Sequence, residues 1–451
     1  MNTLKAGFAR IDITPMLGIP LAGAFELRPA SEIMDPLEAT ALAVSDGKTT
    51  ALFVSLDVLQ VPRILAKDLQ QAIMEATGVP VECIYLHGTH THSGPFIYKE
   101  NPHPLVQEHL RTLTHKAADV CVMAIKDLKP AKMGWAVGKE SRVAFIRRFR
   151  MKDGSAMCNP GIHNPEIEGY IGKIDDRVNI LRFDRGEDDS LVLVNFGNHP
   201  CVVGGTGISA DWPGFMRRTV EAALPGCKCV FFNGCEGDVN HINVFLKDTD
   251  RPLTYDQDEK FKKQRYDYTR YIGRVMAGTV LQEFDRVKYV DVDSVRCLQR
   301  TVQIPNNIPD PSEVPAAKKL VERLEAGEVD ALHAEYPGMM FETVMGNARR
   351  ITKMENGPAY EEMEVTAIAL GNVAFVGYPG EPFSEVGFRT KNTEGWELIL
   401  PTACTNGGQG YFPMEYDYKD ATYEAVASRF KPGAAELLIS NAKEMLEQLK
   451  A

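Results

Sequence analysis

Several segments of the chain share one pattern, in which a run of apolar, β-branched or aromatic residues ends abruptly in polar or glycine-containing residues. Runs with few polar interruptions are typical of strands that are buried on both faces, as in α/β sheets. The segments expected to be such strands are 51–56, 84–86, 191–196, 230–232, 373–376 and 398–400. The residues that directly follow them are Asp57, His87, Gly197-Asn198-His199, Asn233-Gly234, Gly377 and Pro401.

Amphipathic helical segments alternate with these runs. They are predicted over Leu65–Thr77, Pro104–Leu128 and Trp212–Leu224, and a terminal amphipathic helix follows Pro432. The alternation predicts an α/β fold of mixed, mostly buried sheets flanked by helices. Ligands of open α/β sheets gather outside the carboxyl ends of the strands. The His, Asp, Glu and Asn residues at those ends therefore indicate an enzyme site.

Residues 303–363 have a different, more charged pattern. Ser312 is expected to cap a helix that runs to about Leu324, and a second helix is expected over Val329–Lys353. We interpret this region as a helical insertion or arm within one large catalytic domain, 1–451. Two roles stay open for it, a cover that reshapes a pocket and an arm that makes contacts in a homo-oligomer.

Charge and composition narrow the possible partners. The 451 residues include 50 basic and 61 acidic side chains, which gives a net charge of −11 and argues against nucleic acid as a partner. No run of 18 apolar residues and no apolar leader at Met1–Phe8 is present, so neither a membrane span nor a signal peptide is expected. The nine scattered cysteines are typical of reduced thiols in a cytoplasmic protein.

The segment 87–95, His-Gly-Thr-His-Thr-His-Ser-Gly-Pro, contains three of the ten histidines. On an extended backbone His90 and His92 point to the same side, so one could bind a metal while the other lies beside a bound water. A catalytic zinc needs about three protein ligands and one open position. The alternative interpretation is a polar strand end whose histidines are satisfied by other hydrogen bonds.

Two further strand ends carry potential ligands. His199, which precedes Pro200, would supply a second imidazole on extended backbone. Glu381 lies between Gly380 and Pro382 after a predicted buried strand. A glutamate at a helix N-terminus, stabilised by the helix dipole, is the alternative for Glu381.

Three other polar segments have structural explanations beside functional ones. Asp211 before Trp212-Pro213 is expected to cap a helix. Asp238, within the glycine-containing segment 234–241, either orients a partner or belongs to a polar turn. The basic segment 142–150 favours a solvated strand face, with a clamp for an anion or carbonyl as the alternative.

Several of these segments together resemble the neutral, non-lysosomal ceramidase family. His90-Thr91-His92-Ser93-Gly94-Pro95 is similar to its His-Thr-His-Ser-Gly-Pro signature, and Ala6–Pro15 is similar to its first strand. Gly380-Glu381 with Phe383 resembles its Pro-Gly-Glu-Phe segment. The two tyrosines Tyr411 and Tyr423 have the spacing found in that family.

The resemblance implies a zinc amidohydrolase with a fold like the ceramidase N-terminal domain. The metal ligands that it implies are His90, His199, Glu381 and Tyr411. His92 and Tyr423 would then lie beside the bound water and the scissile carbonyl, and Arg147 would touch substrate. Asn240 replaces a serine of the family, so a mechanism with that serine as nucleophile does not apply. The family's C-terminal immunoglobulin-like domain is not expected here.

The sequence thus predicts a zinc-dependent hydrolase that cleaves an amide bond. Because no segment suited to docking on lipid is visible, we expect a small, polar, water-soluble substrate and no membrane partner. An ester or lactone hydrolase with the same zinc site is one alternative. A non-catalytic sugar-binding or polyol-binding protein is the other.

Overall fold

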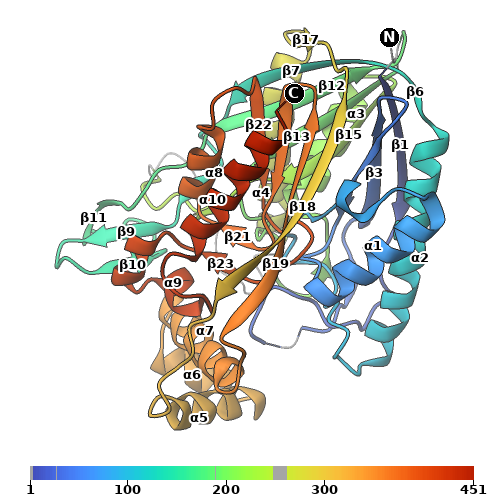
Figure 1. The fold of residues 1–451 in the computed structure, drawn as a ribbon. Coiled ribbons are helices and arrows are strands. Elements are labelled where there is room, and N and C mark those ends of the chain that lie inside the picture. Colours follow the sequence, from blue (N-terminus) through green and yellow to red (C-terminus); the bar gives the residue numbers. More distant parts are fainter. Residues whose placement is uncertain (1–3, 27, 188, 247–261, 451) are drawn as a thin grey trace.

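Three β-sheets form the centre of the protein in a computed structural model, which describes residues 4–26, 28–187, 189–246 and 262–450 (Figure 1). The first sheet, in the order β5-β4-β3-β1-β6, contains Ile84–Gly88, Thr50–Leu56, Glu38–Ser45, Lys5–Asp12 and Lys129–Pro130. The second, in the order β15-β13-β12-β7-β17, contains Cys227–Asn233, Ser190–Phe196, Arg177–Asp184, Lys132–Lys139 and Lys288–Val290. The third, in the order β18-β19-β20-β22, contains Val295–Pro305, Tyr360–Leu370, Val373–Gly377 and Leu398–Thr402.

Each sheet ends at one edge in a parallel pair, while its other described pairs are antiparallel. The parallel pairs are β4 with β5, β13 with β15, and β20 with β22. These are the six strands that the apolar runs of the sequence predict, so the expectation of mixed α/β sheets is confirmed. Parallel neighbours end on the same side of a sheet, which brings their carboxyl-terminal loops together.

The inner faces of the three sheets share one core. Phe53 of β4 lies 4.5 Å from the ring of Phe375, 5.6 Å from Tyr85 and 6.2 Å from Phe232, measured between ring centroids. Leu52, the neighbour of Phe53, belongs to a separate core on the outer face of the first sheet. Both faces of these strands are therefore buried, which explains why their sequences lack alternation.

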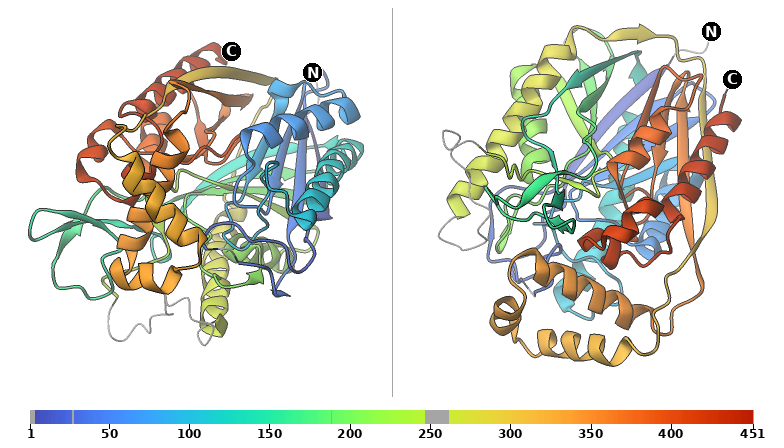
Figure 2. Two further views of the ribbon diagram at one scale, coloured as in Figure 1. Left: turned by 90° about the horizontal axis from the view of Figure 1, so that it is seen from below. Right: turned by 90° about the vertical axis from the view of Figure 1, so that its left-hand side faces the viewer.

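The outer face of each sheet is covered by a pair of helices (Figure 2). The pairs are α1 (Arg63–Thr77) with α2 (Pro104–Lys126), α3 (Asp211–Ala223) with α4 (Lys262–Phe284), and α8 (Ser384–Lys391) with α10 (Ala434–Gln448). The four amphipathic segments of the sequence correspond to α1, α2, α3 and α10, so those predictions are confirmed.

Short strands and turns extend from the carboxyl ends of the sheets. They pair as β2 (Glu32–Ile33) with β14 (Gly207–Ile208), β8 (Phe145–Ile146) with β16 (Val239–Asn240), and β21 (Glu381–Pro382) with β23 (Tyr411–Phe412). A separate small sheet has the order β10-β9-β11, from Ala156–Cys158, Arg148–Met151 and Ile167–Tyr170. The short helix α9 (Tyr423–Ala427) lies near β23, and short helical turns span Val81–Cys83 and Glu415–Asp420.

The charged region between β18 and β19 forms three helices beside α9, away from the sheets (Figure 1). They are α5 (Val314–Glu325), α6 (Val329–Glu335) and α7 (Met339–Met354). The predicted helix over Val329–Lys353 is thus two helices, separated at Pro337-Gly338, where Gly338 has a φ of 58°. Ser312 is not the cap, because its hydroxyl donates to Asp310 and Glu313 holds the cap position.

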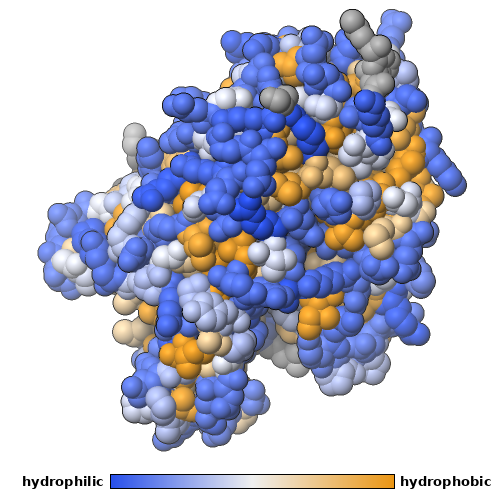
Figure 3. All heavy atoms as spheres, viewed as in Figure 1, coloured by the Kyte–Doolittle hydropathy of each residue, from blue (hydrophilic) through white to orange (hydrophobic). Residues whose placement is uncertain are grey.

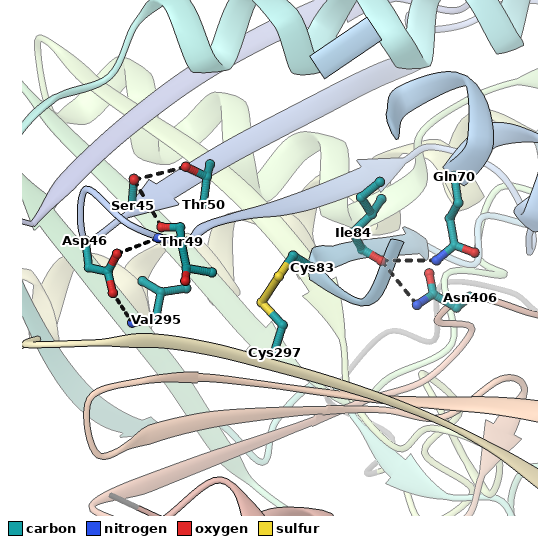
Figure 4. The surroundings of a disulfide bond; sticks show 10 residues. All are labelled: Ser45, Asp46, Thr49, Thr50, Gln70, Cys83, Ile84, Val295, Cys297 and Asn406. Carbon is teal, nitrogen blue, oxygen red and sulfur yellow. Dashed lines mark hydrogen bonds between the residues drawn. A yellow bond between two sulfur atoms is a disulfide. The ribbon is translucent and has the colours of Figure 1, made fainter. Parts of the chain in front are cut away.

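A disulfide joins Cys83, directly before β5, to Cys297 on β18 (Figure 4). It links the first sheet to the third, and the nearby Asp46 carboxylate accepts the backbone N–H of Val295 at 2.9 Å across the same junction. The prediction that all nine cysteines are reduced is therefore wrong for this pair. Seven cysteines are free thiols, and all of them except Cys201 are buried.

Asp211 is the first residue of α3 and not its cap. Its backbone has a φ of 52°, and its carboxylate accepts the backbone N–H groups of Val202 and Val203 at 2.9 and 3.0 Å. The carboxylate also accepts the backbone N–H of Trp212 at 2.6 Å, so it joins the loop after β13 to the first turn of α3. Burial raises the pKa of Asp211 to about 7. The capping prediction is wrong about the cap position, which Ala210 holds, but the side chain does bind the start of the helix.

The surface drawn in Figure 3 is mostly hydrophilic, with hydrophobic residues in small patches. Among the described helices, none has the length and apolarity needed to cross a membrane. Residues 1–3 of the segment Met1–Phe8, and residue 451 of the predicted domain 1–451, lie outside the described residues.

Candidate active site

Three histidines meet where the first and second sheets end. His90 and His92 follow β5, and His199 follows β13. In each ring Nδ1 donates a hydrogen bond to backbone oxygen, which fixes the ring and leaves Nε2 as the free nitrogen. The acceptors are Leu59 at 2.8 Å from His90, Gly23 at 2.9 Å from His92, and Glu236 and Val239, both at 2.9 Å from His199.

The free nitrogens point at one another. The ligand atoms of His90, His92 and His199 all lie within 4.8 Å of one another, and each Nε2 is buried without a hydrogen-bond partner in the described chain. Glu381 Oε2 lies 3.3 Å from Nε2 of both His90 and His199, and it too has no hydrogen-bond partner. Buried polar atoms are normally satisfied, so an unsatisfied cluster needs an explanation.

A metal cation fits this cluster. Two ligands at about 2.1 Å from a tetrahedral zinc lie about 3.4 Å apart, close to the 3.3 Å separations that Glu381 makes. The backbone of His90 has a φ of 73°, an uncommon conformation for a residue other than glycine that is often found at functional sites. Glu381 lies on β21, before α8, and its oxygen faces the imidazoles. The helix-dipole explanation of Glu381 is therefore wrong.

The protonation states in the cluster suit metal binding. Burial lowers the pKa of His199 to about 4, and burial with the neighbouring imidazoles holds the pKa of His92 well below its usual range. Burial alone would raise the pKa of Glu381, but His90 and His199 lower it well below its usual range. A neutral imidazole, as at His92 and His199, and an ionised carboxylate, as at Glu381, are the forms that donate electron pairs to a cation.

Tyr411 and Tyr423 lie next to this cluster. The parallel pairing of β21 with β23 places Tyr411 directly opposite Glu381, and the rings of Tyr411 and Tyr423 are 5.6 Å apart. Burial, with Glu381 nearby, raises the pKa of both phenols above the usual value. Both therefore keep their protons at neutral pH and can donate a hydrogen bond to an oxygen of a bound molecule.

Arg147 connects the two tyrosines to the rest of the site. Its guanidinium carbon lies 5.4 Å from the ring centroid of Tyr411 and 6.0 Å from that of Tyr423. Its Nε donates to Glu424 at 2.6 Å, and another nitrogen donates to the backbone oxygen of Gly237 at 2.7 Å. A buried arginine with these partners orients the aromatic rings, and the Glu424 carboxylate balances its charge.

The solvated face predicted for the basic segment 142–150 is wrong at two of its arginines. Arg147 is only 6% exposed and Arg148 only 2% exposed. Arg148 donates to Asp417 at 2.8 Å, as Arg147 does to Glu424. Both carboxylates are more than 260 residues away in the sequence, so the segment itself gives no sign of these partners.

Asp238 does not lie in the histidine cluster. Its carboxylate accepts the backbone N–H of Ser384 at 2.7 Å and the Ser384 hydroxyl at 3.0 Å, at the start of α8. Gly237, its neighbour, donates its N–H to the backbone oxygen of Pro382 at 2.9 Å. Asp238 and Gly237 thus hold the turn that carries Glu381, which agrees with the polar-turn explanation of Asp238, and a role of Asp238 in binding or orienting substrate stays a prediction.

Glu236 and Cys404 were not identified as site residues from the sequence. With His90 they form a second group whose potential ligand atoms lie within 4.8 Å of one another. Both carboxyl oxygens of Glu236 are buried and have no hydrogen-bond partner among the described residues, and burial together with Glu381 raises the pKa of Glu236 well above the usual value. The signal available was the position of Glu236 between two glycines, Gly234 and Gly237, directly after a strand.

A cavity of about 780 Å³ opens beside the tyrosines. Tyr411, Tyr423 and the loop residue Gln409 line one part of it, and α7 of the three-helix region lines another. Gly346 of α7 lies so close to Tyr423 that an added Cβ would be only 3.0 Å from the phenol ring. The three-helix region therefore forms a wall of the cavity, one of the two roles that the sequence leaves open for it.

Comparison with known proteins identifies the fold. No family model matches the sequence, and no curated protein matches it. Among solved structures, neutral ceramidase from Pseudomonas aeruginosa aligns with a TM-score of 0.73 and 15% identity, over 100% of this chain and 76% of that one. The protein has the neutral ceramidase fold. A ceramidase complexed with C2 aligns over the same shares, with a TM-score of 0.71 and 16% identity.

Proposed function

We propose that the protein is a zinc-dependent hydrolase that cleaves an amide (C–N) bond of a small soluble substrate. The observation that supports this most strongly is the set of unpartnered ligand atoms on His90, His199 and Glu381, all buried at the ends of strands that the fold brings together. The ceramidase fold agrees with a hydrolase, although identities of 15% and 16% support the fold alone.

The proposed metal ligands are His90, His199, Glu381 and Tyr411. The two imidazoles and the carboxylate already have matching separations, and Tyr411 is the register partner of Glu381. Zinc held by these residues would lower the pKa of a bound water to about 7 and would polarise the carbonyl oxygen of the substrate. The backbone acceptors of His90 and His199 keep each Nε2 directed at the same point, which is the usual supporting arrangement for metal-binding histidines.

His92 and Tyr423 are the proposed catalytic groups of the chain itself. The Gly23 carbonyl holds Nδ1 of His92 in its protonated form, so Nε2 is free to accept a proton and pass it to the leaving nitrogen. The Tyr423 phenol, kept neutral by burial, can donate to the carbonyl oxygen as negative charge develops there. Arg147 orients Tyr423 and would contact substrate through its guanidinium N–H groups, and Asp238 supports the site by fixing the turn of Glu381.

Two alternatives differ from this proposal in definite ways. An ester or lactone hydrolase would use the same residues and differ only in the leaving group. A non-catalytic sugar-binding or polyol-binding protein would need neither zinc nor His92. Zinc content of the purified protein, measured together with hydrolysis of matched amides, esters and lactones, tests all three. One zinc per chain with amide hydrolysis supports the proposal, whereas ligand binding without zinc or turnover contradicts it.

The proposal also covers the binding partners. We expect a small-molecule substrate, no nucleic acid and no membrane partner, and a homo-oligomer stays a prediction.

The proposed cellular location is the cytoplasm. The Cys83–Cys297 disulfide is the observation against this location, because disulfides persist mainly in oxidising compartments. Mass spectrometry of protein alkylated inside the cell checks this, since a free Cys83 is expected if the protein is cytoplasmic.

A further inference from the structure

The cavity beside Tyr411 and Tyr423 has an excess of positive charge, in a protein whose net charge is −11. Six of its lining residues are basic and two are acidic. The basic residues are Arg63, Lys99, Arg349, Arg350, Lys353 and Arg429, and the acidic residues are Glu100 and Glu361. An acidic protein that gathers cations around one cavity creates a local potential opposite to that of its whole surface, which attracts anions.

Three of these cations are neutralised by carboxylates. Arg63 lies 2.8 Å from Glu362 and 2.9 Å from Glu364, and Arg429 lies 2.9 Å from Glu361. The third, Lys99, is paired with Asp68. These pairs contribute little net charge to the cavity.

The other three cations, all on α7, make no ion pair within 4.0 Å in the described chain. Arg349 donates to the backbone oxygen of Phe25 at 2.7 Å and lies over its ring. Arg350 donates to the backbone oxygens of Asn307 and Val426 and to the side-chain oxygen of Asn347, and none of these acceptors is charged. Lys353 is exposed to the cavity.

The carboxylates that oppose these three cations all lie beyond ion-pair distance. Glu26, Glu325 and Glu342 act on Arg349, Glu313 acts on Arg350, and Glu361 and Glu100 act on Lys353. Among the described lining residues, three cations without an ion pair therefore face one carboxylate without one, that of Glu100.

Gln409 gives a second, independent sign of a ligand. Its side chain is only 4% exposed, lines the cavity, and has no hydrogen-bond partner for either Oε1 or Nε2 in the described chain. A buried amide with both ends unsatisfied is costly unless another molecule completes its hydrogen bonds. Gln409 lies two residues before Tyr411, so a molecule bound there also reaches the tyrosines.

We propose that this cavity selects an anionic amide as substrate, one that carries a carboxylate or phosphate group. The anion would bind Arg349, Arg350 and Lys353, because guanidinium and ammonium groups are the usual partners of carboxylates and phosphates. Gln409 would hydrogen-bond the middle of the molecule, and its amide carbonyl would lie at Tyr411 and Tyr423. Hydrolysis adds the hydroxyl of water to the acyl carbon and its proton to the leaving amine. The substrate class rests on the proposed hydrolase function.

The test compares three series of small amides on the zinc-loaded protein. They are N-acetyl amino acids, the neutral N-acetyl amino acid carboxamides, and the corresponding N-acetyl aminophosphonates. We expect kcat/KM to be at least about tenfold higher for one of the anionic series than for the carboxamides. The anionic series with the higher kcat/KM shows whether the cavity prefers a carboxylate or a phosphate-like group. Equal or higher kcat/KM for the carboxamides would overturn the proposal.

A matched pair of double variants locates the effect. Arg349→Gln with Lys353→Met changes two exposed residues of the cavity wall, and Arg323→Gln with Lys319→Met makes the same changes on α5, outside the cavity. The first double variant should lose at least about fivefold in kcat/KM on the anionic amides and stay within about twofold on the carboxamides. The second should change neither, and an equal loss on both substrate types in the first would contradict anion recognition.

Direct binding separates this proposal from the hydrolase function. Calorimetric titration of the protein with an N-acetyl amino acid and with its carboxamide measures recognition without turnover. Tighter binding of the acid by at least about tenfold, lost in the cavity-wall variant, supports the anion site even if no amide is cleaved. Equal affinities would overturn the anion site even if amides are cleaved.

Discussion

Two buried carboxylates that follow strands, Asp57 after β4 and Glu381 after β20, have opposite surroundings. Asp57 accepts hydrogen bonds from Arg217 at 2.9 and 2.6 Å, from the backbone N–H of Glu38 at 2.9 Å and from Thr89 at 3.2 Å. Glu381 Oε2 has two imidazole nitrogens at 3.3 Å and no hydrogen bond. The first carboxylate is satisfied by the protein, and the second is left available to a ligand.

The difference shows that a similar position in the fold does not give two carboxylates the same role. Both lie where parallel strands end, so their position alone does not tell a structural carboxylate from one that binds a ligand. Asp57 with Arg217 ties the first sheet to α3 as a buried ion pair, and removal of either partner would leave the other charge buried and unpaired. Glu381 has no such partners in the described chain, which indicates that a bound ligand offsets the cost of burying its charge.

The largest expected effect comes from removing the unsatisfied group. His199→Ala and Glu381→Gln should each lose bound zinc and at least about a thousandfold in kcat/KM, because both residues are proposed metal ligands. Metal analysis by mass spectrometry and initial rates on the same preparations check this. Retention of one zinc per chain in both variants would remove these residues from the metal site.

The satisfied group should behave in the opposite way. Arg217→Met leaves Asp57 as an unpaired buried charge and should lower the free energy of unfolding by about 3–5 kcal/mol. Zinc content should stay at one per chain, since Asp57 takes no part in the metal cluster. Urea denaturation followed by circular dichroism measures the loss. If Arg217→Met instead lost zinc at unchanged stability, the contrast between the two carboxylates would fail.

His92 refines the comparison inside the cluster. His92→Ala should keep zinc and lose roughly a hundredfold in kcat, the usual range for a group that transfers protons. The reason is geometric, since Glu381 lies within ion-pair distance of His90 and His199 but not of His92. Loss of zinc in this variant would make His92 a ligand and reverse the assignment within His-Thr-His.

Asp211, a third buried carboxylate, should give the smallest effect. Its folded-state pKa is raised to about 7, so the folded protein holds this proton more tightly than the unfolded chain. The stability from this group is therefore present at low pH and is lost as pH rises toward 7. Between pH 5 and pH 8 the loss should lower the free energy of unfolding by about 2–3 kcal/mol, and Asp211→Asn should remove that part of the pH dependence. Urea denaturation of both proteins at pH 5 and pH 8 measures this difference. If Asp211 is ionised throughout, the original protein and Asp211→Asn would show the same dependence of the free energy of unfolding on pH.

The parts of this molecule that are predictable from sequence are those that depend on local pattern. Continuous apolar runs give strands such as β4 and β13, and 3.6-residue periodicity gives helices such as α2. The carboxylate partner of Arg147 lies 277 residues away in the sequence, and no local pattern contains it. The break at Pro337-Gly338 was missed because periodicity on both sides resembles one helix.

The candidate site divides in the same way. His90, His92 and His199 stand out because histidines cluster at predicted strand ends, and the structure brings them together with Glu381. Glu236 was missed because a glutamate between glycines is equally typical of a solvated turn. The unpaired charges of the cavity wall were also not predictable from the sequence. Whether an arginine on α7 has a carboxylate partner depends on how the whole chain packs.

Anomalous scattering at the zinc edge from crystals of the purified protein tests the central claim most directly. The account predicts one peak per chain, located between Nε2 of His90, Nε2 of His199 and Oε2 of Glu381. A peak bound instead by His90, Glu236 and Cys404 would contradict the assignment of the ligands. No peak in protein prepared without chelators and supplied with equimolar zinc would contradict the metal site itself.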